Sequence, residues 1–174
     1  QFWKHKNHIV LLKALLLSIE KYGKGFHVYF SGSLTDSRNQ TYFDELMEFI
    51  NVHNLNEYVH ILGFIERNDQ LTIMKYCKAV IQTSMFEGWS TVVEDAKSLN
   101  KKIICSNLNV HMEQLRSNGI YFDVNDYEDL LKKIEIVDEF QYQNFDYEQN
   151  IRRFGDTLIK VIHEIISKNH NSHP

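Results

Sequence analysis

The stretch Tyr58–Ser84, "YVHILGFIERNDQLTIMKYCKAVIQTS", decides the fold. It predicts a strand over 58–64, a helix over 68–77 and a second strand over 79–84. Both strands are largely continuous apolar runs, which is typical of strands covered on both faces of a parallel sheet. The stretch therefore predicts one strand–helix–strand unit of an α/β protein.

The same alternation continues on both sides of this unit. Asn7 is positioned to cap a helix that runs to Tyr22, with Gly23 in the place where a left-handed residue ends a helix. The other predicted elements are strands over 26–33, 101–106 and 119–124 and helices over 41–54, 91–99, 109–117, 126–140 and 147–168. We expect a Rossmann-like parallel sheet with helices on both faces.

Composition narrows the class of protein. The chain has 174 residues, enough for one core, and it is 43% hydrophobic and 24% charged. The net charge of −4 argues against a general nucleic-acid surface. Cys77 and Cys105 both lie in or beside apolar runs, so we expect a reducing, cytoplasmic setting and no disulfide framework. The apolar run over 9–19 is too short to span a bilayer.

The carboxyl ends of parallel strands are where such sheets bind ligands, and the third strand ends at "MFEGWSTVVEDAK", Met85–Lys97. Thr91 and Glu94 have the spacing of a capping box, which explains Glu94 as a structural residue. A cap at Ser90 or Thr91 leaves backbone N–H groups free at a helix N-terminus, where anions bind. Glu87 would repel a phosphate and suits a sugar hydroxyl instead. The pattern indicates a nucleotide-sugar site.

The motif and its surroundings resemble the group 1 glycosyltransferases (glycosyltransferase family 4, GT-B fold). The likeness rests on "FEGWSTVVEDAKSLNKKIICSN" over 86–107, followed by "NVHMEQL". It extends to the opening "QFWKHKNHIVLLKAL" and to the unit over 58–84, and so covers nearly the whole chain. The resemblance identifies the chain as the C-terminal, donor-binding domain, one half of a GT-B fold.

The resemblance implies a retaining hexosyltransferase that takes a nucleotide-diphosphate sugar as donor, without a metal ion or other cofactor. Glu87 would contact the donor sugar, and Lys6 would neutralise the charge that builds on the leaving phosphate. The family's second acid falls on Asp95, which would hold the ribose. Asp95 is one methylene shorter than the usual Glu, and Gln1 stands where many members have Arg.

Further donor contacts follow from the same alignment. Ser90, Thr91 and Val92 would offer backbone N–H groups to the diphosphate. The loop at Phe64–Arg67 would lie near the base. The full set of predicted donor-binding residues is Gly32, Phe64, Ile65, Arg67, Gly88, Trp89, Ser90, Thr91, Val92, Glu94 and Asp95.

We expect residues 1–168 to form the donor domain and 169–174 a disordered tail. The acceptor, a glycan or a lipid-linked group, would bind a separate N-terminal domain, and the chain alone would be inactive. That domain would also carry any peripheral attachment to the inner face of the membrane. The family further implies a role in surface polysaccharide biosynthesis.

Other readings stay open at this stage. The scaffold fits a non-catalytic interaction domain, and the GT-B architecture also fits a sugar-nucleotide epimerase. His5 and His8 have metal-ligand spacing but no acidic or Cys partner nearby in the sequence. His111, with Glu113, fits either a substrate contact or a solvated turn. No Gly-rich dinucleotide motif, P-loop or nucleophile-elbow motif is present.

Overall fold

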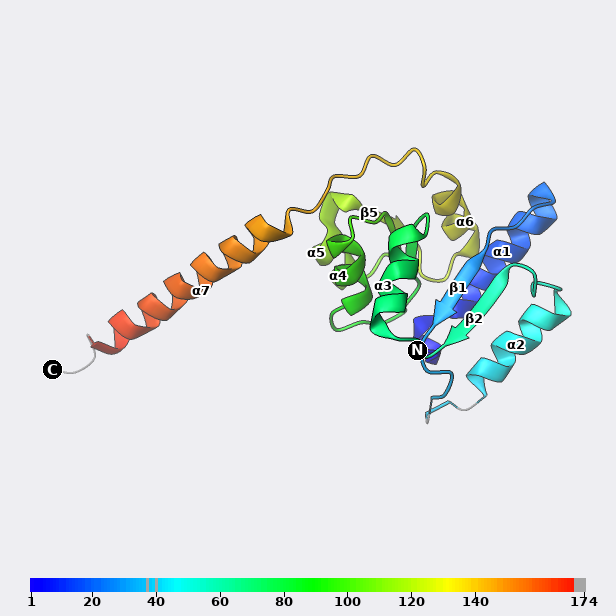
Figure 1. Ribbon diagram of the computed structural model, residues 1–174, viewed down its shortest axis with the longest axis horizontal. Helices are drawn as coiled ribbons and strands as arrows, with labels where there is room; N and C mark the ends of the chain where they lie inside the picture. Colours follow the sequence, from blue (N-terminus) through cyan, green and yellow to red (C-terminus); the bar gives the residue numbers. More distant parts are fainter. Residues whose placement is uncertain (37, 40, 171–174) are drawn as a thin grey trace. The chain divides into compact units, whose positions relative to one another are not determined.

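The structure is a computed structural model that describes residues 1–36, 38–39 and 41–170. The chain divides into two compact units, Gln1–Gln143 and Asn144–Pro174. The first unit holds all five strands, with helices packed around them (Figure 1). The predicted limits of the donor domain, 1–168, stay a prediction.

Seven α-helices and two short 3-10 turns lie in the described residues. The α-helices are α1 (His8–Tyr22), α2 (Tyr42–Val52), α3 (Arg67–Tyr76), α4 (Thr91–Ser98), α5 (Asn109–Leu115), α6 (Tyr127–Glu135) and α7 (Tyr147–His170). The 3-10 turns are η1 (Lys4–Lys6) and η2 (Arg116–Asn118). The α7 helix extends two residues past the predicted end, and residues 171–174 of the expected tail lie outside the described part.

The strands are β1 (Val28–Ser31), β2 (Val59–Gly63), β3 (Val80–Gln82), β4 (Ile103–Ser106) and β5 (Gly119–Phe122). Every pairing is parallel, as predicted, but the pairing is divided: β1 pairs with β2, and β4 lies between β3 and β5. The register aligns Gln82 with Cys105 and Ser106 with Phe122. The Rossmann-like α/β fold is thereby confirmed, with shorter strands than the apolar runs suggest.

One hydrophobic core joins both sets of strands. It contains side chains from α1, α2, β1, β2, β4, β5 and α6, with Leu12, Leu15 and Leu130 fully buried. The α1 helix contributes most because its apolar residues go most of the way round, and it packs along α6. It ends as predicted at Gly23, which has φ +66° and donates its N–H to Ile19 O.

Asn7 is the N-cap residue of α1, as predicted, but its side chain does not cap the helix. Asn7 is left-handed, with φ 54°, and its side chain makes no cap bond; its Nδ2 donates instead to Val124 O at 2.8 Å. The side chain thereby ties the start of α1 to the end of β5. A partner 117 residues away is invisible to local cap rules.

The segment before α1 joins the ends of two strands. Phe2 N donates to Ser33 O just beyond β1, and Met85 N donates to His5 O just beyond β3. The Thr83 hydroxyl also donates to Lys6 O at 2.6 Å. These bonds hold η1, and with it Lys6, against the carboxyl end of β3.

The second unit consists mainly of α7. Its apolar side chains lie at helical spacing and are exposed, among them Ile151, Phe154, Leu158, Ile162 and Ile165. Within the described residues, no helix has the length and apolar character needed to cross a membrane.

Candidate functional site

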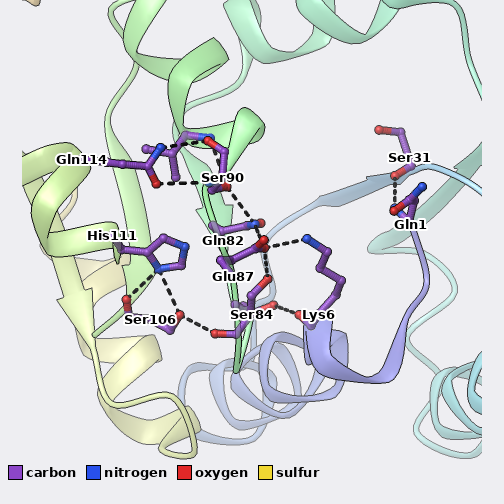
Figure 2. Close-up of polar contacts among 12 residues, drawn as sticks. Gln1, Lys6, Ser31, Gln82, Ser84, Glu87, Ser90, Ser106, His111 and Gln114 are labelled. Carbon is purple, nitrogen blue, oxygen red and sulfur yellow. Dashed lines mark hydrogen bonds and ion pairs between the residues drawn. The ribbon is translucent and has the colours of Figure 1, made fainter. Parts of the chain in front are cut away.

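The centre of the site is an ion pair between Lys6 and Glu87. Lys6 Nζ lies 2.6 Å from Glu87 Oε1, although 81 residues separate the two in sequence. The same oxygen accepts bonds from Gln82 Nε2 at 2.8 Å and from the Ser84 hydroxyl at 2.7 Å (Figure 2). The two predicted catalytic residues are therefore in contact, and β3 supplies the groups that orient them.

Glu87 is held ionised by these donors. Burial alone would raise the pKa of the carboxyl, but the hydrogen bonds from Lys6 and Ser84 and the charge of Lys6 outweigh it. The net result is a pKa below the ordinary value. Glu87 is thus a fixed, negatively charged hydrogen-bond acceptor, suited to a hydroxyl and unsuited to a phosphate.

Ser90 caps α4, so the predicted capping box of Thr91 with Glu94 is wrong. The Ser90 side chain accepts from Val93 N at 3.4 Å, and Thr91 is the first helical residue. Glu94 consequently stands one position beyond the place a capping box requires. Ser and Thr are both good caps, and the choice falls on Ser90 because its hydroxyl is buried and also accepts from Gln82 Nε2 at 3.2 Å.

Ser90→Ala is expected to lower the free energy of unfolding by about 1 kcal/mol because the cap of α4 is lost. For a chain of this size that corresponds to roughly 2–4 °C in the melting temperature. Thr91→Ala, at an exposed position, is the matched control and should change stability by less than about 0.5 kcal/mol. Thermal melts followed by circular dichroism would check both, and a larger loss for Thr91→Ala would restore the capping-box assignment.

Gln114 takes up one of the three backbone N–H groups predicted for the diphosphate. Its Oε1 accepts from Ser90 N at 3.3 Å and its Nε2 donates to Ser90 O at 3.0 Å. Ser90 N is therefore already paired, which corrects its predicted role. In the described part of the chain, the backbone N–H groups of Thr91 and Val92 have no hydrogen-bond acceptor, so they remain able to bind an anion.

The two adjacent acids of α4 have different surroundings. Asp95 pairs with Arg67, the first residue of α3, and so brings the end of β2 next to α4. Glu94 accepts from Gln114 Nε2 at 2.9 Å and pairs with Lys97 at 3.0 Å. Glu94 thus supports the side chain that holds Ser90, whereas Asp95 reaches toward the loop after β2.

The remaining predicted donor-binding residues are Gly32, Phe64, Ile65, Gly88 and Trp89. Gly32 has φ +133°, and an added Cβ would lie 2.2 Å from Gln1 N, so the close approach there requires glycine. Phe64 is 82% exposed and Trp89 53% exposed. Ile65 is half-buried and Gly88 is exposed. Among the described residues, no hydrogen bond or ion pair joins the side chains of Phe64, Ile65 or Trp89 to the Lys6–Glu87 pair.

His111 is fully buried in α5, so the solvated-turn reading is wrong. Its Nδ1 lies 2.9 Å from Ser106 O, and the Ser106 hydroxyl donates onward to Ser84 O at 2.6 Å. Burial lowers the pKa of His111, the Ser106 carbonyl and the charge of Glu87 oppose this, and the charge of Lys6 adds to it. Figure 2 shows the ring on the same side of the site as Glu87. Glu113, two residues on, is exposed.

Sequence reasoning missed Gln82, Ser84 and Gln114, which build the site through hydrogen bonds. A signal for Gln82 exists: it is a polar residue inside the apolar run "AVIQTS" and is only 9% exposed. A buried amide in a strand needs partners, and here they are Glu87 and Ser90. Gln114 has no comparable signal, because one Gln on a short helix is ordinary.

Metal binding has no support from side-chain clustering in the part of the chain that the structure describes. No group there of three or more His, Cys, Asp and Glu side chains could hold an ion. His8, half of the histidine pair noted in the sequence, stacks on Phe2 with ring centroids 4.7 Å apart.

The geometry agrees with what comparison with known proteins shows. The profile of the family "Glycosyl transferases group 1" matches residues 1–154. The chain belongs to the group 1 glycosyl transferases. A search of curated proteins found no match.

Three solved structures with the same fold illustrate the similarity. A glycosyltransferase from Rickettsia africae has a TM-score of 0.69 and 20% identity over 80% of this chain and 36% of its own. HepE of Anabaena, in complex with UDP, has a TM-score of 0.73 and 21% identity over 92% of this chain and 47% of its own. Sucrose-phosphate synthase of Thermosynechococcus elongatus has a TM-score of 0.69 and 14% identity over 94% of this chain and 44% of its own. The chain thus spans less than half the length of these proteins.

Proposed function

We propose that this chain is the C-terminal donor-binding domain of a family 4, GT-B glycosyltransferase, and that it binds a nucleotide-diphosphate sugar. The single observation that carries the proposal is the contact between Lys6 and Glu87 at the N-terminal end of α4. A cation and free backbone N–H groups suit a diphosphate, and an adjacent fixed carboxylate suits sugar hydroxyls. The family match and UDP in the Anabaena structure support the same ligand class.

The proposed binding mode assigns each group a part of the donor. The diphosphate takes the N–H groups of Thr91 and Val92 and draws Lys6 away from Glu87. A sugar hydroxyl then replaces the ammonium group on Glu87 Oε1. The ribose binds Asp95, beside Arg67, and the base lies over the loop that carries Phe64 and Ile65.

Lys6 would lower the barrier to transfer because it stabilises the charge that grows on the leaving phosphate. Placed before reaction begins, its ammonium group needs little reorganisation as the sugar–phosphate bond breaks. The fixed cation and the α4 N-terminus together would do this without a metal ion. Retention of configuration and hexosyl transfer follow from the family resemblance alone.

The proposal also covers the acceptor of the transferred sugar. A glycan or lipid-linked acceptor would bind an N-terminal domain outside this chain, and the chain alone would bind donor without transferring it. We further propose a cytoplasmic role in surface polysaccharide biosynthesis, with any peripheral membrane attachment made by that domain.

Calorimetric titration with UDP, GDP and ADP and their hexose conjugates would test the function. We expect one nucleotide series to bind and to raise the melting temperature as ligand concentration rises. Absence of binding across all the series would contradict a donor site and favour a non-catalytic interaction domain. The epimerase alternative would appear as release of free nucleotide and rearranged sugar without any acceptor.

A further inference from the structure

One polar atom beside the ion pair has no use in the proposed binding mode so far. His111 Nε2 is buried, and among the described residues it has no hydrogen-bond partner. Leaving a buried polar atom unpaired costs free energy, so such atoms usually face a water molecule or a ligand. The other ring nitrogen contacts Ser106 O, and the charge of Glu87 acts on the pKa of His111.

The hydrogen bonds of the other ring nitrogen fix what Nε2 can do. A carbonyl oxygen only accepts, so the 2.9 Å contact with Ser106 O requires a proton on Nδ1. The Ser106 hydroxyl, 3.2 Å from Nδ1, already donates to Ser84 O. Burial also lowers the pKa of His111, against the opposing effects of Ser106 and Glu87, which keeps the ring neutral. Nε2 is therefore a bare acceptor.

We infer that His111 Nε2 accepts a hydrogen bond from a hydroxyl of the donor sugar, next to the hydroxyl held by Glu87. This rests on the proposed function, because Glu87 is taken to face the sugar. The carboxylate of Glu87 and Nε2 of His111 would then each accept a hydrogen bond, so a sugar with two free O–H groups can bond to both. The inference therefore predicts a donor sugar with free hydroxyls on neighbouring carbons of the sugar ring.

Access to Glu87 Oε1 depends on the same movement that binds the diphosphate. In the structure Lys6 Nζ lies 2.6 Å from Glu87 Oε1, and its charge adds to burial in lowering the pKa of His111. When the ammonium group turns to the diphosphate, Glu87 Oε1 becomes open to a sugar hydroxyl.

Two substitutions of His111 distinguish the contributions of its two ring nitrogens. His111→Asn keeps an amide N–H near the position of Nδ1, able to donate to Ser106 O, and removes the distal acceptor. His111→Gln places an amide oxygen near the position of Nε2 and keeps that acceptor. His8→Asn, at another packed histidine ring, is the control for the effect of losing an imidazole from the core.

The measurement is the ratio of dissociation constants for a free nucleotide and its sugar conjugate, using UDP with UDP-glucose or GDP with GDP-mannose. We expect His111→Asn to lower the ratio of the nucleotide's dissociation constant to that of the sugar conjugate by about three- to tenfold, with the affinity for the nucleotide unchanged. His111→Gln should recover most of it, and His8→Asn should leave the ratio as in the wild type. In the wild type, replacing one particular sugar hydroxyl with fluorine should cost affinity, and in His111→Asn that replacement should cost none.

Other results would overturn the inference. Equal weakening of nucleotide and conjugate by His111→Asn would mean a structural role, and no change would mean that Nε2 faces only water. Nucleotide binding without any gain from the sugar would refute this inference and leave the nucleotide site intact. Absence of all binding would instead refute the proposed function, so the two failures can be told apart.

Discussion

Lys6→Met is expected to weaken binding of a nucleoside diphosphate by roughly 10- to 100-fold, the largest effect on affinity that the site predicts. The reason is that Lys6 is the cation paired with Glu87 in the segment that leads into α4, and a hydrogen bond to a charged group contributes about 1.5–3 kcal/mol. Calorimetry with UDP, GDP or ADP, whichever binds, would measure the loss. The affinity should also fall as salt is added, because the contact is partly exposed.

Removing Lys6 also leaves Glu87 without its counter-ion, which can destabilise the fold on its own. The double variant Lys6→Met with Glu87→Gln removes the stranded charge and its repulsion of the diphosphate, so it should bind the free nucleotide less weakly than Lys6→Met alone but more weakly than the wild type. Lys13→Met, at an exposed position of α1, is the control and should bind as the wild type does. Wild-type affinity in both Lys6 variants would show that the diphosphate binds elsewhere.

Asp95→Ala and Glu94→Ala are expected to affect different properties, although the residues are adjacent. Asp95→Ala should weaken nucleotide binding by about tenfold, because a charged hydrogen bond to the ribose is lost. Glu94→Ala should leave binding nearly intact and lower the melting temperature by about 2–4 °C, since Gln114 and Lys97 lose their partner.

A 2′,3′-dideoxy nucleotide makes the test of Asp95 specific. If Asp95 binds the ribose hydroxyls, the dideoxy analogue should bind the wild type and Asp95→Ala about equally. A full tenfold difference with that analogue would show that Asp95 acts through Arg67 or through the fold. Reversal of the two phenotypes would mean that Glu94 is the ribose-binding acid.

The fold could be predicted because its signal is local and repeated. The apolar strands around β2 and β3 and the helical periodicity of α1 each point to the same α/β architecture. Strand lengths could not be predicted in the same way. The run over 79–84 supplies only Val80–Gln82 as paired strand, and just beyond it the backbone N–H of Met85 donates to His5 O outside the sheet.

The division of the strands into two separately paired sets could also not be predicted from the sequence. Which strands pair depends on contacts that close long loops, and these leave no periodic pattern in the sequence. The segment Phe2–Lys6 joins the ends of β1 and β3, and its local sequence does not predict these contacts. Its backbone bonds to Ser33 and Met85 are what place Lys6 against Glu87.

The site itself was predictable where one motif carries it and not where distant residues build it. The motif led to Glu87, Lys6 and Asp95, and the structure places the first two in contact. The hydrogen bonds of Gln114 to Ser90 and of Arg67 to Asp95 connect different helices over 24 and 28 residues. Those contacts decide which backbone N–H groups stay free, and spacing rules do not contain them.

The central claim is that a nucleoside diphosphate binds at the N-terminus of α4 beside Lys6. Amide NMR spectra of the chain, titrated with the best-binding of UDP, GDP and ADP, test it most directly. The account predicts the largest shifts at Thr91 and Val92, with smaller ones at Lys6 and Asp95. Shifts concentrated instead along the α1–α6 groove, at Lys21 and its neighbours there, would contradict it.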